Sequence, residues 1–343
     1  MLKNRLVKMG FALMATAMIA SGQSVAQAAE FRVGLVLDRG GKDDKSFNAS
    51  AFRGASEAEK TLGVKVKTVE APDDQAFETM LRSFAQKKFD LIISIGVGQA
   101  SAVQKVASQF KDSKFVLVDA EVNLPNVRSI LFEEHEGSFL MGYVASLASK
   151  SGKVGFIGGM DIPLIRRFQL GYEAGAKKAN SSTKVVSNYI GVTSEAWNNP
   201  PKGRELALSQ MDGGVDVIFS AAGASGAGLF DAIEERSKGV AAKRFAIGVD
   251  SNQNWVKPGL VLTSMIKRVD RAVLSSIQDT KSGTFSGGTQ RLGLANQGID
   301  YAIDQHNASI LTPEMRKSLD AVRKEIVNGK VKVPDYYKNS RKG

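Results

Sequence analysis

The chain has 343 residues, of which 43% are hydrophobic, and this is enough to bury the cores of two globular lobes. It contains no cysteine, which excludes disulfides, thiolate metal sites, a cysteine nucleophile and an acylated lipoprotein cysteine. The formal net charge is +11, but lysine and arginine are scattered among 35 acidic residues, so the composition does not favour binding to a nucleic acid polymer.

The N-terminal segment is predicted to be a secretory signal peptide over residues 1–28. Three basic residues within the first eight positions precede an apolar stretch at 9–20, and Ala26-Gln27-Ala28 matches a small-x-small cleavage site. A first buried helix or a membrane anchor is the alternative, although the apolar stretch is short for a membrane span. Cleavage removes three positive charges and lowers the net charge from +11 to +8. No later apolar run reaches about 18 residues, so we expect a soluble, non-lipidated protein in a bacterial periplasm.

From Phe31 onward, short β-rich runs alternate with amphipathic helical segments, which is the pattern of parallel βαβ units. We assign residues 29–150 to a first, doubly wound lobe. Its predicted strands are 31–37, 64–69, 91–95, 115–118 and 127–131. Its predicted helices are 48–61, 74–86, 99–110 and 136–148.

The same pattern restarts after residues 149–152 and predicts a second lobe of similar plan over 151–266. Its predicted strands are 154–157, 185–190, 217–219, 245–249 and 260–265. The remainder carries a predicted helix at 270–280, a strand at 290–294, a helix near Tyr301 and a helix at 314–327. These elements are too few for a domain, so parts of 267–310 should complete the first lobe and parts of 267–343 the second. Several crossings between two α/β lobes would form a hinge with the ligand in the cleft.

The loop after the first strand is the first candidate ligand site. In open α/β sheets, ligands bind where strands end and helices begin, because backbone N–H groups and loop side chains converge there. This loop carries Asp38 and then Phe47 and Asn48, an aromatic and an amide at the start of a predicted helix. We therefore expect these side chains to contact a ligand.

Polar residues also follow other predicted strands, at positions that should face the same cleft. Asp119 and Asp250 each follow an apolar run, Gly223 begins a glycine-rich turn, and Lys267 follows the run at 260–266. A single aspartate at a strand end is more often a helix cap or a turn residue. Two aspartates, a lysine and a glycine-rich backbone at equivalent ends of two lobes favour a shared small-molecule site.

Trp197 lies in a loop rich in asparagine and proline, which favours a surface role over a core role. Packing against Pro200 or Pro201 is the alternative. Phe47 from one lobe and Trp197 from the other could clamp a flat ring, because stacking on aromatic faces contributes about 1–3 kcal/mol per base. The aspartates suit the rest of a nucleoside, since carboxylates accept hydrogen bonds from base N–H groups and sugar hydroxyls.

Other motifs give no positive evidence for catalysis. Asp43-Asp44 imitates a catalytic pair, but adjacent loop carboxylates usually point apart and cap helices. His135 and His306 are the only histidines, and neither has a partner at metal-ligand spacing. We therefore expect a protein that is not an enzyme and needs no metal or cofactor.

Several segments resemble, in order, the basic membrane protein family of substrate-binding proteins, which includes purine nucleoside receptors of ABC transporters. They are DDKSFNASAFRG at 43–54, VDA at 118–120, FEEHEGSFLMGYVA at 132–145, GFIGGMDIPLIRRFQLGYEAGAK at 155–177, AAGASGAG at 221–228, IGVDSNQ at 247–253, TSMIKRVDRAV at 263–273, LGLANQGI at 292–299 and VKVPDY at 331–336. The resemblance implies a type I periplasmic-binding fold, with two lobes, three crossings and a nucleoside in the cleft.

The resemblance also implies roles for the candidate residues. Phe47 would stack on the base, Asp119 would bind the base edge, and Asp250 with Lys267 would hold the ribose. Asn48 and the backbone near Gly223 would assist, with Asp38 a further contributor, and Trp197 stands where the family commonly has phenylalanine.

The implied function is capture of a nucleoside, with a purine nucleoside favoured, by a soluble monomer that delivers it to an ABC permease in the inner membrane. The same fold binding a sugar, a flavin-like compound or a signalling ligand, or acting as a ligand-presenting sensor subunit, is the alternative. Many members of the family are lipoproteins, so the absence of a lipobox cysteine is a departure that argues against a membrane anchor.

Overall fold

The first sheet of this computed structural model has six strands in the order β11-β5-β4-β3-β1-β2. The strands are β1 (Arg32–Leu37), β2 (Lys65–Glu70), β3 (Leu91–Ile95), β4 (Phe115–Val118), β5 (Val127–Phe132) and β11 (Gly288–Leu292). All of its pairings are parallel. The central strands β1, β3 and β4 are almost wholly buried, as expected for a parallel sheet that is covered on both faces.

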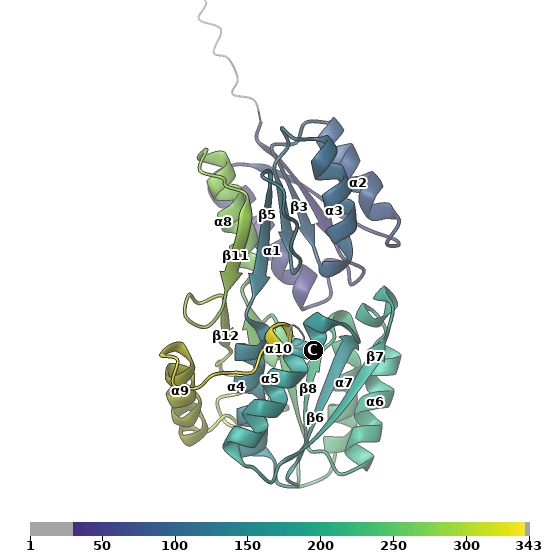
Figure 1. Ribbon diagram of the computed structural model, residues 1–343. Helices are drawn as coiled ribbons and strands as arrows, with labels where there is room; N and C mark the ends of the chain where they lie inside the picture. The colour runs from purple at the N-terminus through teal and green to yellow at the C-terminus, as the bar shows by residue number, and fades with distance from the viewer. Residues whose placement is uncertain (1–29, 340–343) are drawn as a thin grey trace, which may run out of the picture. The chain divides into compact units, whose positions relative to one another are not determined.

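Helices cover both faces of this sheet (Figure 1). They are α1 (Phe47–Leu62), α2 (Ala76–Gln86), α3 (Ala100–Gln109) and α8 (Val269–Lys281), with the short 3-10 helix η1 (Val97–Gln99) before α3. Residues of β1 alternate between the faces: Leu35 packs in the cluster with α1 and α8, and Val36 packs in the cluster with α2 and α3. This alternation follows from the two-residue period of a strand.

The second sheet repeats the plan in the order β12-β10-β9-β8-β6-β7. Its strands are β6 (Lys153–Met160), β7 (Lys184–Gly191), β8 (Val217–Ala221), β9 (Phe245–Asp250), β10 (Val261–Lys267) and β12 (Ile299–Tyr301). Its helices are α4 (Glu134–Ala148), α5 (Pro163–Ala179), α6 (Pro200–Asp212), α7 (Ala227–Ser237), α9 (Pro313–Val327) and α10 (Tyr336–Asn339). The 3-10 helices are η2 (Ser194–Trp197), η3 (Gly223–Gly226) and η4 (Asn254–Val256).

Helices α4 and α5 lie together on one face of the second sheet because glycines let their backbones approach (Figure 1). A Cβ atom on Gly142 would stand 1.9 Å from the carbonyl oxygen of Tyr172, and one on Gly175 would stand 1.9 Å from that of Phe139. Any larger residue at either position would force the two helices apart. The start of α4 is thereby held close to the middle of α5, where Gly171 meets His135.

The chain crosses between the sheets three times: after β5, after β10 and between β11 and β12. The predicted plan of two doubly wound lobes joined by three crossings is confirmed. One boundary differs from our assignment at residue 150. Helix α4 packs against α5 and the second sheet, so the first crossing lies near Phe132 and Glu134.

The helix predicted near Tyr301 is wrong, because these residues form strand β12. Ile299 and Tyr301 are both buried, and β12 pairs antiparallel with β10. Three residues are too few to reveal a strand by alternation, and the pairing partner lies more than thirty positions earlier in the chain.

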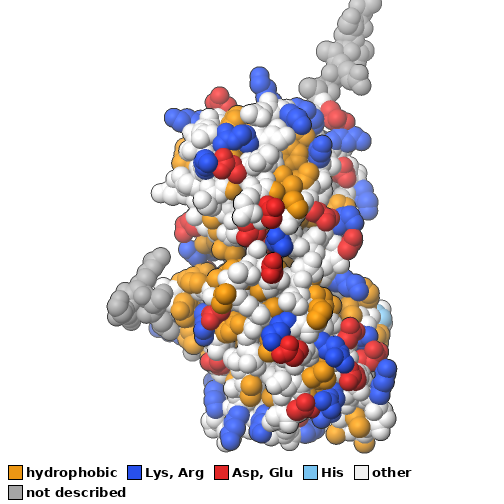
Figure 2. All heavy atoms as spheres, turned by 90° about the vertical axis from the view of Figure 1, so that its right-hand side faces the viewer, with side chains coloured by type: hydrophobic (Ala, Val, Ile, Leu, Met, Phe, Trp, Pro, Cys, Tyr) orange, Lys and Arg blue, Asp and Glu red, His pale blue; other side chains and the backbone are white. Residues whose placement is uncertain are grey.

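The structure describes residues 30–339, and residues 31–339 belong to one compact unit. The predicted signal peptide and its cleavage site lie outside the described residues. Within residues 30–339, none of the helices combines the length and the apolar character that crossing a membrane requires. On the face seen in Figure 2, acidic and basic side chains are intermingled and form no continuous basic block.

Candidate functional site

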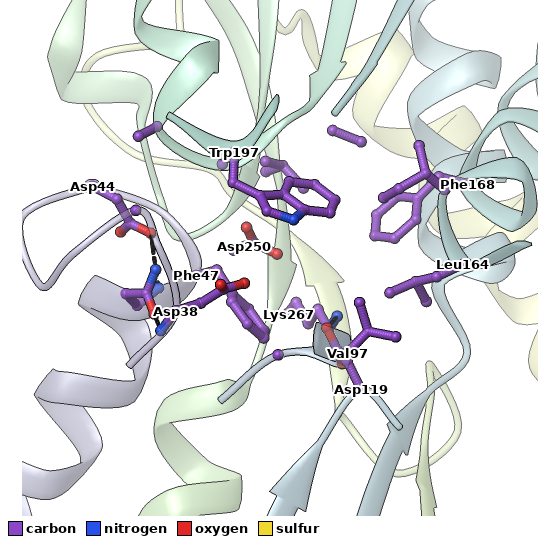
Figure 3. A pocket seen from close by; sticks show the side chains of 18 residues that line it. Asp38, Asp44, Phe47, Val97, Asp119, Leu164, Phe168, Trp197, Asp250 and Lys267 are labelled. Atoms are coloured by element: carbon purple, nitrogen blue, oxygen red, sulfur yellow. Dashed lines mark hydrogen bonds and ion pairs between the residues drawn. The ribbon is translucent and has the colours of Figure 1, made fainter. Parts of the chain in front are cut away.

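One cavity lies at the carboxyl ends of strands from both sheets and takes up about 560 Å³, measured to its open mouth. The structure places all eight predicted site residues on its wall: Asp38, Phe47, Asn48, Asp119, Trp197, Gly223, Asp250 and Lys267. Figure 3 shows their side chains, which come from both sheets and converge on a single space.

The side chains of Asp119 and Lys267 form a buried ion pair across the cavity floor. Asp119 follows β4 of the first sheet and Lys267 ends β10 of the second, and Lys267 Nζ donates to Asp119 Oδ2 over 2.6 Å. Lys267 Nζ also lies 3.3 Å from Glu134 Oε1, at the start of α4. Asp119 Oδ1 is buried and has no hydrogen-bond partner among residues 30–339, so this oxygen remains free to accept a ligand donor.

Burial and charge act in opposite directions on this pair. Burial raises the pKa of Asp119 to about 7, although the neighbouring Lys267 ammonium lowers it. Burial works against the charged form of Lys267, but the Asp119, Glu134 and Asp250 carboxylates outweigh it and hold the pKa of Lys267 above its usual range. The lysine therefore stays charged, and it also lies 5.0 Å from the centroids of the Phe47 and Phe132 rings.

Asp250 occupies the position in the second sheet that Asp119 occupies in the first, since β9 and β4 stand third from the corresponding edges. Both aspartates have positive φ angles, 74° for Asp119 and 64° for Asp250, in a region that few non-glycine residues adopt. Ser46 Oγ donates to Asp250 Oδ2 over 2.5 Å. Burial raises the pKa of Asp250 to about 6, against the lowering effects of Lys267 and Ser46.

The loop before α1 is held by the side chains of Asp44 and Asn48. Asp44 accepts hydrogen bonds from the backbone N–H groups of Ser46, Asn48 and Ala49, so it caps α1 as predicted. Asn48 Oδ1 accepts from the backbone N–H of Asp38 over 2.9 Å, and its Nδ2 donates to Asp44 over 3.0 Å. One amide hydrogen of Asn48 is left for a ligand.

Three aromatic rings point into the cavity in Figure 3: Phe47, Trp197 and Phe168. Phe47 comes from the start of α1, and Trp197 ends η2 of the second sheet. The indole of Trp197 lies directly on the backbone of Gly159, where a Cβ atom would stand 2.3 Å from the ring. One side of the Trp197 ring thus packs against Gly159, and the side chain also lines the cavity.

The sequence analysis missed the cavity residues supplied by the first turns of α5. Leu164, Ile165 and Phe168 all line the cavity. Their spacing places them on one face of a helix that begins just after β6, and this signal could have identified them. They add apolar wall to the cavity. Glu134 was missed because it touches the cavity only through Lys267.

One group of side chains among residues 30–339 has the spacing of a metal site, namely Glu133, His135 and Asp335. The guanidinium of Arg167 pairs with both carboxylates of this group, with Nε 2.8 Å from Asp335 Oδ1. A cation therefore already occupies the place where a metal would bind. Burial lowers the pKa of His135 to about 3, with Arg167 adding to the effect, so the imidazole is neutral.

A family model described as "ABC transporter substrate-binding protein PnrA-like", Bmp, matches residues 31–336. The chain belongs to this family. The Bmp family comprises substrate-binding proteins of ABC transporters, and the resemblance inferred from the sequence motifs is thereby confirmed.

Curated relatives and solved structures agree with this assignment. The chain is 34% identical over 332 residues to the ABC transporter nucleoside-binding protein BmpA of Lactococcus lactis subsp. cremoris, covering 92% of each chain. It is 33% identical to an uncharacterized lipoprotein of Pyrococcus abyssi, covering 80% of this chain and 70% of that protein. A solute-binding protein of an Aeropyrum pernix ABC transporter superposes with a TM-score of 0.79 at 29% identity, covering 89% of this chain and 94% of that one.

Proposed function

We propose that this protein is a soluble periplasmic receptor that captures a nucleoside between its lobes, with a purine nucleoside favoured, and delivers it to an ABC permease in the inner membrane. The observation that carries the proposal is that Phe47, from α1 of the first lobe, and Trp197, from η2 of the second, line one cavity that also holds two buried aspartates. A flat ring between two aromatic faces gains about 1–3 kcal/mol per contact.

The polar groups divide between the two parts of a nucleoside. Asp119 Oδ1, buried and without a partner in the described chain, would accept a hydrogen bond from an N–H on the base edge. Asp250 and Lys267 both line the cavity, where the Lys267 charge acts on Asp250, and they would bind the ribose hydroxyls. Asn48 would add one amide donor, and the backbone at Gly223 would approach the ligand closely.

Charge favours an uncharged ligand over a phosphorylated one. The cavity wall carries four carboxylates, Asp38, Asp44, Asp119 and Asp250, and one ammonium, Lys267. A phosphate group would meet this excess of negative potential at short range, where the low dielectric strengthens repulsion. Nucleosides should therefore bind more tightly than their 5′-phosphates.

The name of the Lactococcus lactis relative, a nucleoside-binding protein, supports the ligand class, and the missing cysteine supports a protein that is free of lipid. The direct test is isothermal titration of the purified mature protein with nucleosides, free bases, nucleotides and sugars. We expect binding of at least one nucleoside, and binding of sugars without any nucleoside would overturn the proposal. Asp119→Ala separates the two ligand classes, because only a base edge needs this carboxylate; Asp112→Ala, at an exposed aspartate away from the cavity, is the matched control.

A further inference from the structure

Three sequence motifs meet at one buried side chain that lies outside the cavity wall. They are FEEHEGSF at the start of α4, PLIRRFQLG in α5, and VKVPDY before α10. Arg167 of the second motif is 1% exposed and lies between acidic side chains of the other two. Such a buried charge requires close partners, because desolvation without them is costly.

All three nitrogen atoms of the Arg167 guanidinium donate hydrogen bonds. Nη1 donates to Glu134 Oε2 over 2.7 Å and to the carbonyl oxygen of Phe132, Nε donates to Asp335 Oδ1 over 2.8 Å, and Nη2 pairs with Glu133. The ring of Tyr337 covers the guanidinium, 5.1 Å from its carbon to the ring centroid. The C-terminal segment around Asp335 is thus fastened to the first crossing between the sheets.

Glu134 connects this cluster to the ligand cavity. Its Oε2 accepts from Arg167, and its Oε1 lies 3.3 Å from Lys267 Nζ. Lys267 in turn donates to Asp119 over 2.6 Å on the cavity wall. An alternating row of charges therefore runs from Asp119 through Lys267, Glu134 and Arg167 to Asp335.

We propose that Arg167 and Asp335 are positioning residues of the ligand site: they hold Glu134 so that Lys267 keeps its place and its charge in the cavity. This inference rests on the proposed function, since it assigns a role to residues behind the same site. When Asp335 no longer neutralises Arg167, the guanidinium competes more strongly for Glu134 and draws it away from Lys267. Lys267 then holds to Asp119 alone, and its ammonium is less well placed for a ligand hydroxyl.

The simpler explanation is that Arg167 only stabilises the fold, and the chain offers a matched control for it. Arg128 is 2% exposed, its Nη1 lies 2.7 Å from Asp279 Oδ2, and Phe285 covers its guanidinium at 4.8 Å. The arginine of this second cluster resembles Arg167 in burial and aromatic contact, but its single carboxylate partner, Asp279, is 39% exposed where Asp335 is 6% exposed, and the cluster lies outside the cavity wall. Asp279→Asn therefore measures what the loss of such a pair does to stability alone.

The experiment compares Asp335→Asn and Arg167→Lys with Asp279→Asn and Arg128→Lys. All four are made in a Trp255→Phe background, which leaves Trp197 on the cavity wall as the chain's single tryptophan reporter. We expect Asp335→Asn and Arg167→Lys to weaken nucleoside binding, followed by Trp197 fluorescence, about tenfold or more. The two control variants should lose thermal stability, less in Asp279→Asn because Asp279 is partly exposed, and should keep their affinity within about twofold.

A ligand-free measurement separates this inference from the proposed function. The rate at which an amine reagent labels Lys267, followed by mass spectrometry of its peptide, should rise at least threefold in Asp335→Asn and stay unchanged in Asp279→Asn. If the wild-type protein binds no nucleoside but the labelling rates still differ in this way, the proposed function alone is overturned. Equal labelling and equal affinity in Asp335→Asn, Asp279→Asn and the parent would overturn the positioning role.

Discussion

Ser46 and Asp250 join the two lobes beside the cavity: Ser46 Oγ, at the start of α1, donates to Asp250 Oδ2, at the end of β9, over 2.5 Å. The bond is reinforced in the opposite direction, because Ser251 Oγ donates to the carbonyl oxygen of Ser46 over 2.7 Å. Gln253 Nε2 also donates to the carbonyl oxygen of Lys45. These contacts hold the loop before α1 against the end of β9 and the residues that follow it.

The Ser46 hydroxyl links the two lobes, and its hydrogen bond lowers the pKa of Asp250. Ser46→Ala removes this hydroxyl. A net hydrogen bond contributes about 1 kcal/mol, so we expect about that loss of stability and about a fivefold loss of nucleoside affinity. Chemical denaturation and isothermal titration measure the two effects. Ser276→Ala is the control, because this buried serine donates to Ala272 within α8 and should affect stability only. Equal affinities for the two variants would show that the Ser46 contact does not support the ligand site.

Gly159→Ala tests the position of the Trp197 indole. The added Cβ would stand 2.3 Å from the ring, so the indole must leave its place on β6. We expect the tryptophan emission to shift and nucleoside affinity to fall about tenfold. Gly98→Ala is the matched control, since its Cβ would meet only Phe77, at an ordinary 3.8 Å. A shift in the tryptophan emission with unchanged nucleoside affinity would show that Trp197 does not stack on the ligand.

The sequence located those site residues that follow strands directly. Asp119, Asp250 and Lys267 come at the ends of strands that their apolar runs made visible, and parallel strands carry their carboxyl ends to the same edge. Trp197 was located by a different signal, the loop composition around it. In these cases a local pattern was sufficient because the topology of α/β units is strongly constrained.

The residues that escaped prediction depend on contacts between distant segments. Glu134 acts through Lys267, which follows it by more than a hundred positions. Strand β12 exists through its pairing with β10. None of these contacts leaves a periodic trace in its own segment, so local pattern alone could not identify them.

The Lys267 and Asp119 side chains should be energetically coupled. Lys267→Met leaves Asp119 and Glu134 without their shared ammonium, and we expect the free energy of unfolding at pH 7 to fall by about 3 kcal/mol. Adding Asp119→Asn removes one of the stranded carboxylates and should recover part of this loss. Urea denaturation of the four proteins in the cycle gives the coupling energy, expected at about 1–3 kcal/mol. Additivity within about 0.5 kcal/mol would contradict a direct pair.

The ligand-free protein should become less stable as the pH rises, because the buried Asp38 carboxyl group loses its proton. Burial raises the pKa of Asp38 from 3.8 to about 6, against the hydrogen bond from the Arg39 N–H, so the folded protein binds a proton that the unfolded chain releases. The stabilisation from that proton is complete below pH 3.8 and is lost as the pH rises through about 6.

Asp38→Asn keeps the acceptor for the Arg39 N–H and removes the charge, so it should imitate the protonated side chain at every pH. We expect it to raise the free energy of unfolding by about 3 kcal/mol at pH 8 and to change it little at pH 4, since one pKa unit corresponds to about 1.4 kcal/mol. Urea denaturation without ligand at one-unit steps from pH 4 to pH 8 measures this difference. Asp112→Asn, at an exposed aspartate, should leave the wild-type profile unchanged. A constant difference across the pH range would mean that the Asp38 carboxylate is not destabilised by burial.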